Sequence, residues 1–302
     1  MRSIEQIITA MARYRYITDR PLATVLFLAQ ALKKPLFLEG QPGVGKTEVA
    51  LVLSRLLRAR LIRLQCYEGL DVHSALYEWN YPRQILKIRT AEATGQVSPD
   101  LEQTLFGEEF LIRRPLLEAI LSEDPRPPVL LIDELDRADE EFEAFLLEIL
   151  SDFQVSIPEI GTLKARRRPW VVITSNRTRD IHDALKRRCL YHWLEYPTRE
   201  KEYQIILSRI PGIDQELAAQ LARFMTRLRR EDLTKKPGIS ETLDWAQALI
   251  HLHRLALDEY TVQETLGCIL KYEEDQRFFR EQILGEASRK EALFDGLSPR
   301  CS

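Results

Sequence analysis

Cysteine is scarce in this chain of 302 residues, and its spacing excludes two kinds of site. The four cysteines have no Cys-x-x-Cys spacing and no paired histidines beside them: Cys66, Cys189, Cys268 and Cys301. A disulfide framework or a structural zinc site needs closer clustering than this. We therefore expect free thiols.

Long apolar runs and an excess of one charge are also missing. No apolar stretch approaches the roughly twenty residues of a membrane helix, and Met1–Ala12 lacks the apolar core of a signal peptide. The net charge of -3 gives no general attraction to nucleic acid or an anionic membrane. With 45% hydrophobic and 29% charged residues, we expect a cytoplasmic globular protein with one large and one small domain.

What the sequence does contain, up to Pro197, is a series of short apolar runs separated by helical patterns. The runs have the length of buried strands and lie at 35–38, 61–66, 129–132, 170–174 and 191–194. Such strands with helices between them predict a parallel sheet covered on both faces. Helical spacing is also present over 1–33 and from Glu48 to Arg58.

A long stretch between the second and third runs, residues 71–128, reads as an insertion in the sheet scaffold. It has helical patterns at 83–93 and 114–122, with a Gly/Ser/Pro break at 95–99 between them. Its aromatic residues, Tyr77, Trp79 and Tyr81, fit either a grip on a client protein or packing beneath the insertion.

After Pro197 the pattern is wholly helical. We expect helices through 217–228 and 243–257, and a third that begins with a capping box over 261–264. The domain boundary is therefore placed at Pro197, with an α/β domain over 1–196 and a helical domain over 197–302.

The segment after the first strand has the full spacing of a phosphate-binding loop. Gly40-Gln41-Pro42-Gly43-Val44-Gly45-Lys46-Thr47 fits G-x4-G-K-[ST], between a strand and a helix beginning at Glu48. The glycines let backbone N–H groups surround phosphate oxygens, while Lys46 would reach the β- and γ-phosphates and Thr47 would ligate Mg²⁺. The alternative is a chance glycine-rich turn. We predict ATP and Mg²⁺ as cofactors, bound by residues 40 to 48.

Two carboxylates, Asp133 and Glu134, end the third apolar run. Asp133 would hold Mg²⁺, and Glu134 would polarise the water that attacks the γ-phosphate. Ligands of such sheets collect at the carboxyl ends of the strands, where this pair is expected to lie. The alternative is that both acids merely begin the acidic helix that follows.

A polar residue ends the fourth run, and two arginines close the helical segment that precedes the last run. Asn176 closes the fourth run and would hydrogen-bond the γ-phosphate or the attacking water; the alternative is an Asx turn. Either Arg187 or Arg188 could enter a neighbouring subunit's site as an arginine finger, which stabilises charge on the transferring phosphoryl group. Basic side chains also simply favour the C-terminus of a helix.

These motifs, in this order, resemble those of the AAA+ superfamily, and several segments are similar to its MoxR branch. The resemblance covers roughly residues 5 to 258 and rests on the phosphate loop and on 109–120, 130–138, 145–150, 154–158 and 237–245. Segments 77–82 and 238–245 look most like the MoxR-type ATPases encoded with carbon monoxide dehydrogenase and related molybdenum hydroxylases.

The resemblance implies a P-loop ATPase with a five-stranded parallel sheet flanked by helices, and an all-helical C-terminal lid. It also implies a ring, usually a hexamer, a partner with a von Willebrand factor A (VWA) domain, and a chaperone-like role in maturing a client metalloenzyme. Residues 71–128 would hold the helix-2 insert, and 154–164 a hairpin; both would face the pore or the client.

One position departs from the family. The lid usually supplies an arginine after Ser-Pro that touches the γ-phosphate, whereas here Glu241 and Thr242 follow Ser240. Thr242 cannot supply that charge, so the second sensor is missing or a basic residue elsewhere replaces it.

Three functions fit these observations. The first is an ATP-driven remodeller of a protein client. The second is a nucleic-acid motor or restriction-type nucleotidase, supported by Arg166-Arg167-Arg168, although a short basic run is more often a solvated loop. The third is a P-loop scaffold without turnover, which Asp133, Glu134 and Asn176 argue against.

Overall fold

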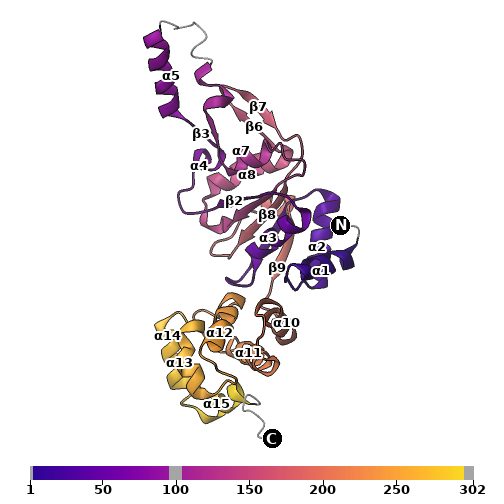
Figure 1. Cartoon of the computed structure of the whole chain (residues 1–302), viewed down its shortest axis with the longest axis vertical. Coiled ribbons are helices and arrows are strands. Elements are labelled where there is room, and N and C mark those ends of the chain that lie inside the picture. The colour runs from indigo at the N-terminus through magenta and orange to yellow at the C-terminus, as the bar shows by residue number, and fades with distance from the viewer. Residues whose placement is uncertain (1–2, 95–103, 296–302) are drawn as a thin grey trace. The chain divides into compact units, whose positions relative to one another are not determined.

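The computed structural model describes residues 3–94 and 104–295, which form two compact units (Figure 1). Within these residues, the first unit contains 3–7, 20–39 and 47–193, and the second contains 8–19, 40–46 and 194–295. Most of the phosphate loop is thus grouped with the C-terminal helices. The break expected at 95–99 lies outside the described residues.

The first unit is built on a five-stranded sheet in the order β2-β5-β8-β1-β9. The pairs β1–β8, β2–β5 and β5–β8 are parallel, which confirms the predicted α/β class. Every residue of β1 and β5 is buried because helices cover both faces, whereas the edge strand β2 alternates between buried and exposed residues. The strands are β1 (Leu36–Gly40), β2 (Leu61–Gln65), β5 (Val129–Asp133), β8 (Trp170–Ser175) and β9 (Leu190–Leu194).

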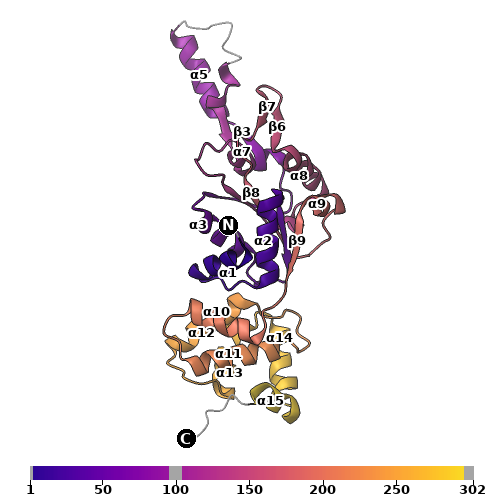
Figure 2. The same ribbon diagram turned by 90° about the vertical axis from the view of Figure 1, so that its right-hand side faces the viewer.

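Helices lie on both faces of this sheet (Figures 1 and 2). Phe37, Ile132 and Ile173 point toward one face and share a single core with the buried side chains of α7, α8 and α9. Helix α3, which follows β1, lies on the other face, as expected for right-handed crossovers between parallel strands. These helices are α3 (Lys46–Leu57), α7 (Pro115–Ile120), α8 (Glu140–Asp152) and α9 (Asp183–Arg188).

The N-terminal helical pattern is two helices rather than one. They are α1 (Ile4–Arg13) and α2 (Arg20–Leu32). Arg15 adopts a left-handed conformation with φ 60°, which ends the first helix, so a turn interrupts the helical spacing reported over 1–33. The spacing of apolar residues gives no signal for such a turn, because it has the same phase on both sides.

The insertion contains a short two-stranded ribbon that apolar patterning did not predict. Strands β3 (Tyr77–Trp79) and β4 (Leu111–Arg113) pair antiparallel, next to α4 (Val72–Leu76), α5 (Tyr81–Thr94) and η1 (Glu108–Phe110). The predicted aromatic group divides: Trp79 is buried and packs edge-on against Tyr77 and Phe106, whereas Tyr81 is exposed. The expected hairpin is confirmed as β6 (Gln154–Ile157) and β7 (Gly161–Lys164).

The second unit is helical from α10 onward, around a core that includes Phe224, Trp245 and Phe279. Its C-terminal helices are α10 (Arg199–Arg209), α11 (Gln215–Leu228), α12 (Ile239–His251), α13 (Glu259–Ile269), α14 (Glu273–Phe278), η3 (Phe279–Ile283) and α15 (Ala287–Phe294).

Two boundary predictions in this unit were wrong. Helix α12 ends at His251 and does not continue to residue 257, because His253 turns into the left-handed region with φ 53°. The predicted capping box at 261–264 lies inside α13, which begins earlier: the N-cap is Asp258, whose carboxylate accepts a hydrogen bond from the Thr261 N–H at 2.7 Å.

Candidate functional site

The phosphate loop predicted at residues 40–47 joins β1 to α3. Gly43 and Gly45 have φ of 76° and 93°, in the left-handed region that only glycine adopts without strain. The Lys46 ammonium donates to the carbonyl oxygens of Gly40 and Gln41 at 2.7 and 2.8 Å. Within the loop Gln41 and Pro42 are exposed and Val44 is buried; Thr47 and Glu48, in the first turn of α3, are partly buried.

The two predicted Mg²⁺ ligands lie together. The Thr47 hydroxyl donates to Asp133 Oδ1 at 3.0 Å, and the Thr174 hydroxyl donates to the same oxygen at 2.6 Å. Asp133 ends β5 and is 2% exposed, so these hydroxyls replace water around its carboxylate. A hydroxyl and a carboxylate at one point are ligands that suit Mg²⁺, and the residues present fit that ion.

A guanidinium covers the other oxygen of the same carboxylate. Arg63 on β2 donates to Asp133 Oδ2 from Nε at 3.1 Å and from Nη2 at 2.6 Å. The register places Arg63 opposite Leu131 on the neighbouring strand, so its side chain needs only to reach along β5 to Asp133. Both donors share one oxygen, and these charge-assisted hydrogen bonds leave Asp133 Oδ1 to the two threonine hydroxyls.

Glu134 is held in an uncommon backbone conformation. Its φ of 56° and ψ of 51° are left-handed, which is rare for a residue that is not Gly, Asn or Asp. Its carboxylate accepts from Gln65 Nε2 at 3.2 Å and pairs with Arg137 Nε at 2.8 Å. The acidic helix α8 begins only at Glu140, after the short helix η2 (Leu135–Arg137), so the alternative that Asp133 and Glu134 begin that helix was wrong. Strained residues of this kind cluster at functional sites.

Asn176 follows β8 and is tied to the acidic segment through a buried carboxylate. Its backbone N–H donates to Asp136 Oδ1 at 3.1 Å, while the Thr178 N–H and hydroxyl donate to Asp136 Oδ2 at 2.9 and 2.7 Å. Burial opposes ionisation of Asp136, but the hydrogen bonds from Thr178 and Asn176 outweigh it and lower its pKa. The loop that carries Asn176 is thus fixed to the turn after Glu134.

The two candidate finger arginines end α9 and differ in their surroundings. Arg188 donates to the Leu147 carbonyl oxygen and to the Ser151 hydroxyl, both on α8 of the same chain. Both side chains are exposed, but that of Arg187 makes no hydrogen bond or ion pair within the described residues. Arg187 therefore has the side chain that is available to another molecule.

Sequence reasoning missed several polar residues that hold these groups in place. Beside the phosphate loop, Glu39 is buried and accepts hydrogen bonds from the Tyr191 hydroxyl at 2.9 Å and the Ser175 hydroxyl at 3.3 Å. Burial, together with Glu39, raises the pKa of Tyr191 to about 12. The available signal was a set of polar residues at the carboxyl ends of strands: Glu39, Gln65, Thr174 and Ser175.

Two searches of the described residues were negative. No cluster of three or more His, Cys, Asp or Glu that could hold a metal ion occurs in 3–94 and 104–295. No helix in that part of the chain has the length and apolar character needed to cross a membrane.

The segment that contains these residues matches a known protein family. The model of the family described as "AAA domain (dynein-related subfamily)" matches residues 35–189. Uncharacterized proteins from two strains of Staphylococcus epidermidis are each 27% identical over 256 residues, which are 82% of this chain and 88% of theirs.

Among solved structures, the chain is similar to the Thermotoga maritima RuvB Holliday junction branch migration motor. The identity is 18% with a TM-score of 0.45, over 82% of this chain and 66% of the motor, just under two thirds of its length. A variant of that motor is 20% identical with a TM-score of 0.48, over 86% of this chain and 72% of the variant.

Proposed function

Because this chain belongs to the AAA domain family, in its dynein-related subfamily, we propose that it is an ATPase whose ATP is bound by residues 40–48. The proposal is supported most directly by the hydrogen bond of 3.0 Å between the Thr47 hydroxyl and Asp133 Oδ1, with Glu134 next in the chain. A Walker-type hydroxyl and carboxylate at hydrogen-bond distance are what a nucleotide-bound Mg²⁺ requires.

Each residue of the site has a proposed role. The Lys46 ammonium would exchange its hydrogen bonds to the Gly40 and Gln41 carbonyl oxygens for bonds to the β- and γ-phosphates. Thr47 and Asp133 would hold Mg²⁺, which would neutralise phosphate charge. Glu134 would accept a proton from the attacking water, and its pairing with Gln65 and Arg137 would aim the carboxylate. Asn176 would orient the same water or the γ-phosphate.

We further propose that the active form is a ring, usually hexameric in the family that the sequence resembles, in which Arg187 enters the neighbouring subunit's site. Both arginines are exposed, but Arg188 already donates hydrogen bonds to Leu147 and Ser151 on α8, which supports Arg187 as the finger. The lid would comprise 197–302, with the boundary at Pro197, between the end of β9 at Leu194 and the start of α10 at Arg199.

The finer proposal rests on the resemblance to MoxR-type ATPases. We propose a chaperone-like remodeller that assists metal-cofactor insertion into a client metalloenzyme, with a VWA-domain partner. The nucleic-acid alternative has little support from the arginine run at 166–168, because Arg167 donates to the Pro125 carbonyl and Arg168 lies 5.4 Å from the Phe153 ring centroid.

ATP hydrolysis measured against protein concentration, with mass photometry on the same samples, tests the shared-site proposal. We expect the activity per subunit to rise as a ring forms. A monomer that hydrolyses ATP at a rate independent of concentration would contradict the shared site and leave a self-contained P-loop enzyme. The Glu134→Gln protein, which should bind ATP without turnover, is then the bait with which to capture the client and a VWA-domain partner.

A further inference from the structure

Two glycines, one in the phosphate loop and one before α12, are in close contact. Gly238 has a φ of -86°, which any residue adopts, so its backbone does not require glycine. The space around it does: a Cβ atom at this position would lie 2.7 Å from Gly43 Cα and 2.8 Å from the Gly43 carbonyl oxygen. Real Cβ contacts are essentially never that short, so any larger residue would push the two segments apart.

One hydrogen bond crosses this contact, and a second stabilises the turn beside it. The Ile239 N–H donates to the Gly43 carbonyl oxygen at 2.8 Å, which joins the first residue of α12 to the phosphate loop. The Gly238 N–H donates to the Glu241 carboxylate at 2.9 Å, which closes the turn at the start of the helix. A displacement of the phosphate loop at Gly43 would therefore also displace the turn at 237–239.

A buried ion pair stabilises the turn at 237–239 from within the helical unit. Arg229, at the end of α11, donates to the two carboxylate oxygens of Glu202 on α10 at 2.5 and 2.7 Å, and to the Pro237 carbonyl oxygen at 2.7 Å. Arg229 is 7% exposed and Glu202 0%, so each depends on the other for its charge partner.

Thr242 is the third member of this group, which we call the brace: Glu202, Arg229 and Thr242. The Thr242 hydroxyl donates to Glu202 Oε1 at 2.7 Å and accepts from Arg229 Nη2 at 3.2 Å. Thr242 is completely buried, so its side chain belongs to the interior of the helical unit. The position at which related lids carry a sensor arginine here joins three helices instead.

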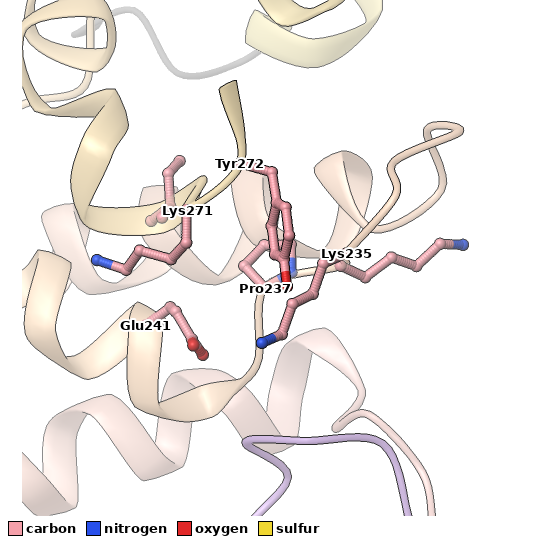
Figure 3. Close-up of a pocket in the computed structure, with 7 residues that line it drawn as sticks. Lys235, Pro237, Glu241, Lys271 and Tyr272 are labelled. Carbon is pink, nitrogen blue, oxygen red and sulfur yellow. The ribbon is translucent and has the colours of Figure 1, made fainter. Parts of the chain in front are cut away.

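Two lysines beside the turn, Lys235 and Lys271, contact other groups of the helical unit. Lys235 lies 5.7 Å from the ring centroid of Tyr272, and Lys271 donates to the Gly267 carbonyl oxygen at 2.9 Å. Figure 3 shows both lysines lining one small pocket with Tyr272, Pro237 and Glu241. Both ammonium groups therefore have partners within the helical unit.

We propose that the lid is coupled to nucleotide binding through the backbone contact between Gly43 and Gly238, held by the brace, and not through a side chain on the γ-phosphate. The proposal rests on the proposed function, since it assumes that residues 40–47 bind ATP. It makes Gly238, Glu202, Arg229 and Thr242 positioning residues. Because Gly43 belongs to the loop that holds every nucleotide, the coupling should act equally on ATP and ADP.

The test measures the affinities for Mg²⁺·ATP and Mg²⁺·ADP of the full chain by calorimetry. Gly238→Ala should weaken both by a similar factor, about tenfold, since small displacements of a binding loop are costly. The matched control is Gly267→Ala in α13, where a Cβ would come no nearer than 4.0 Å to the Gln276 amide nitrogen. This control should change neither affinity.

Thr242→Val is the second variant, in case Gly238→Ala does not fold. It keeps the side-chain shape and removes the hydroxyl that joins Glu202 to Arg229, so we expect a smaller but again equal loss for ATP and ADP. Loss of affinity for ATP alone would overturn the proposal in favour of a γ-phosphate sensor. Wild-type affinities in both variants would overturn it while leaving the proposed function intact. A wild-type chain that binds neither nucleotide would overturn both.

Discussion

The carboxylate of Asp133 accepts hydrogen bonds from three side chains, which belong to three different elements. One oxygen accepts from the Thr47 and Thr174 hydroxyls, and the other carries the Arg63 guanidinium. An ion pair with a carboxylate that is 2% exposed cannot be replaced by water. We therefore expect Arg63 to stabilise this buried charge and to compete for it with the proposed Mg²⁺.

Arg63→Gln allows the effect on stability and the effect on Mg²⁺ binding to be measured separately. We expect the free energy of unfolding to fall by about 1 to 3 kcal/mol, because a buried carboxylate loses a charged hydrogen-bond partner. The Mg²⁺ concentration needed for half-maximal ATP binding should fall as well, because the competing cation is gone. Urea denaturation and a Mg²⁺ titration of ATP binding measure the two.

The matched control is Arg60→Gln, which removes an exposed arginine from its pair with Glu118. A surface pair contributes roughly 0 to 1 kcal/mol, and this one does not touch the candidate site. If both variants behave alike in the Mg²⁺ titration, Arg63 does not compete with the metal.

Between elements, Asp136 joins the turn after β5 to the loop after β8. Its carboxylate accepts three hydrogen bonds from Asn176 and Thr178, which lower its pKa. A lowered pKa in the folded state means that Asp136 stabilises the fold above its unfolded pKa, about 3.9 for aspartate. That stabilisation is lost as the pH falls through the lower, folded-state value.

Asp136→Asn should therefore be less stable than wild type at pH 7, by about 1 to 3 kcal/mol. The difference should begin to shrink as the pH falls below about 4, where this carboxyl becomes protonated in the unfolded chain, and it should vanish only below the lowered pKa of the folded state. Urea denaturation at several pH values from 7 to 3 measures it. A difference that is independent of pH would mean that the ionised form has no special role.

The elements that could be predicted well from the sequence are strands buried on both faces and the phosphate loop. Strands β1, β5 and β8 are continuous apolar runs because both of their faces are covered, and the phosphate loop has a fixed spacing. The ribbon of β3 and β4 has three residues in each strand, too few to show a period. Arg63 gave no signal because its contact with Asp133 depends on the register between two strands that are distant in sequence.

At the scale of the whole molecule, the proposed ring predicts different effects for the two arginines of α9. Arg187→Ala should reduce ATP turnover by about a thousandfold or more, with an unchanged unfolding midpoint, since the Arg187 side chain makes no hydrogen bond or ion pair within the described residues. Arg188→Ala should instead lower stability by about 1 to 2 kcal/mol, because it removes hydrogen bonds to Leu147 and Ser151. Steady-state turnover and thermal unfolding of each variant check this.

Mixing experiments add a control for that prediction. Arg187→Ala keeps its own acidic pair and Glu134→Gln keeps its own finger, so mixed rings contain some complete sites. Turnover should reappear when the two inactive proteins are combined. If the mixture stays inactive although mass photometry shows mixed rings, Arg187 does not act between subunits.

The central claim, that this chain hydrolyses ATP at residues 40–47 with Glu134, is tested most directly by one comparison. ATP binding and phosphate release are measured for wild type, Glu134→Gln and the control Glu123→Gln, whose side chain is exposed. The account predicts that all three bind ATP, and that only Glu134→Gln fails to release phosphate. Phosphate release by Glu134→Gln at the wild-type rate, or no ATP binding by wild type, would contradict it.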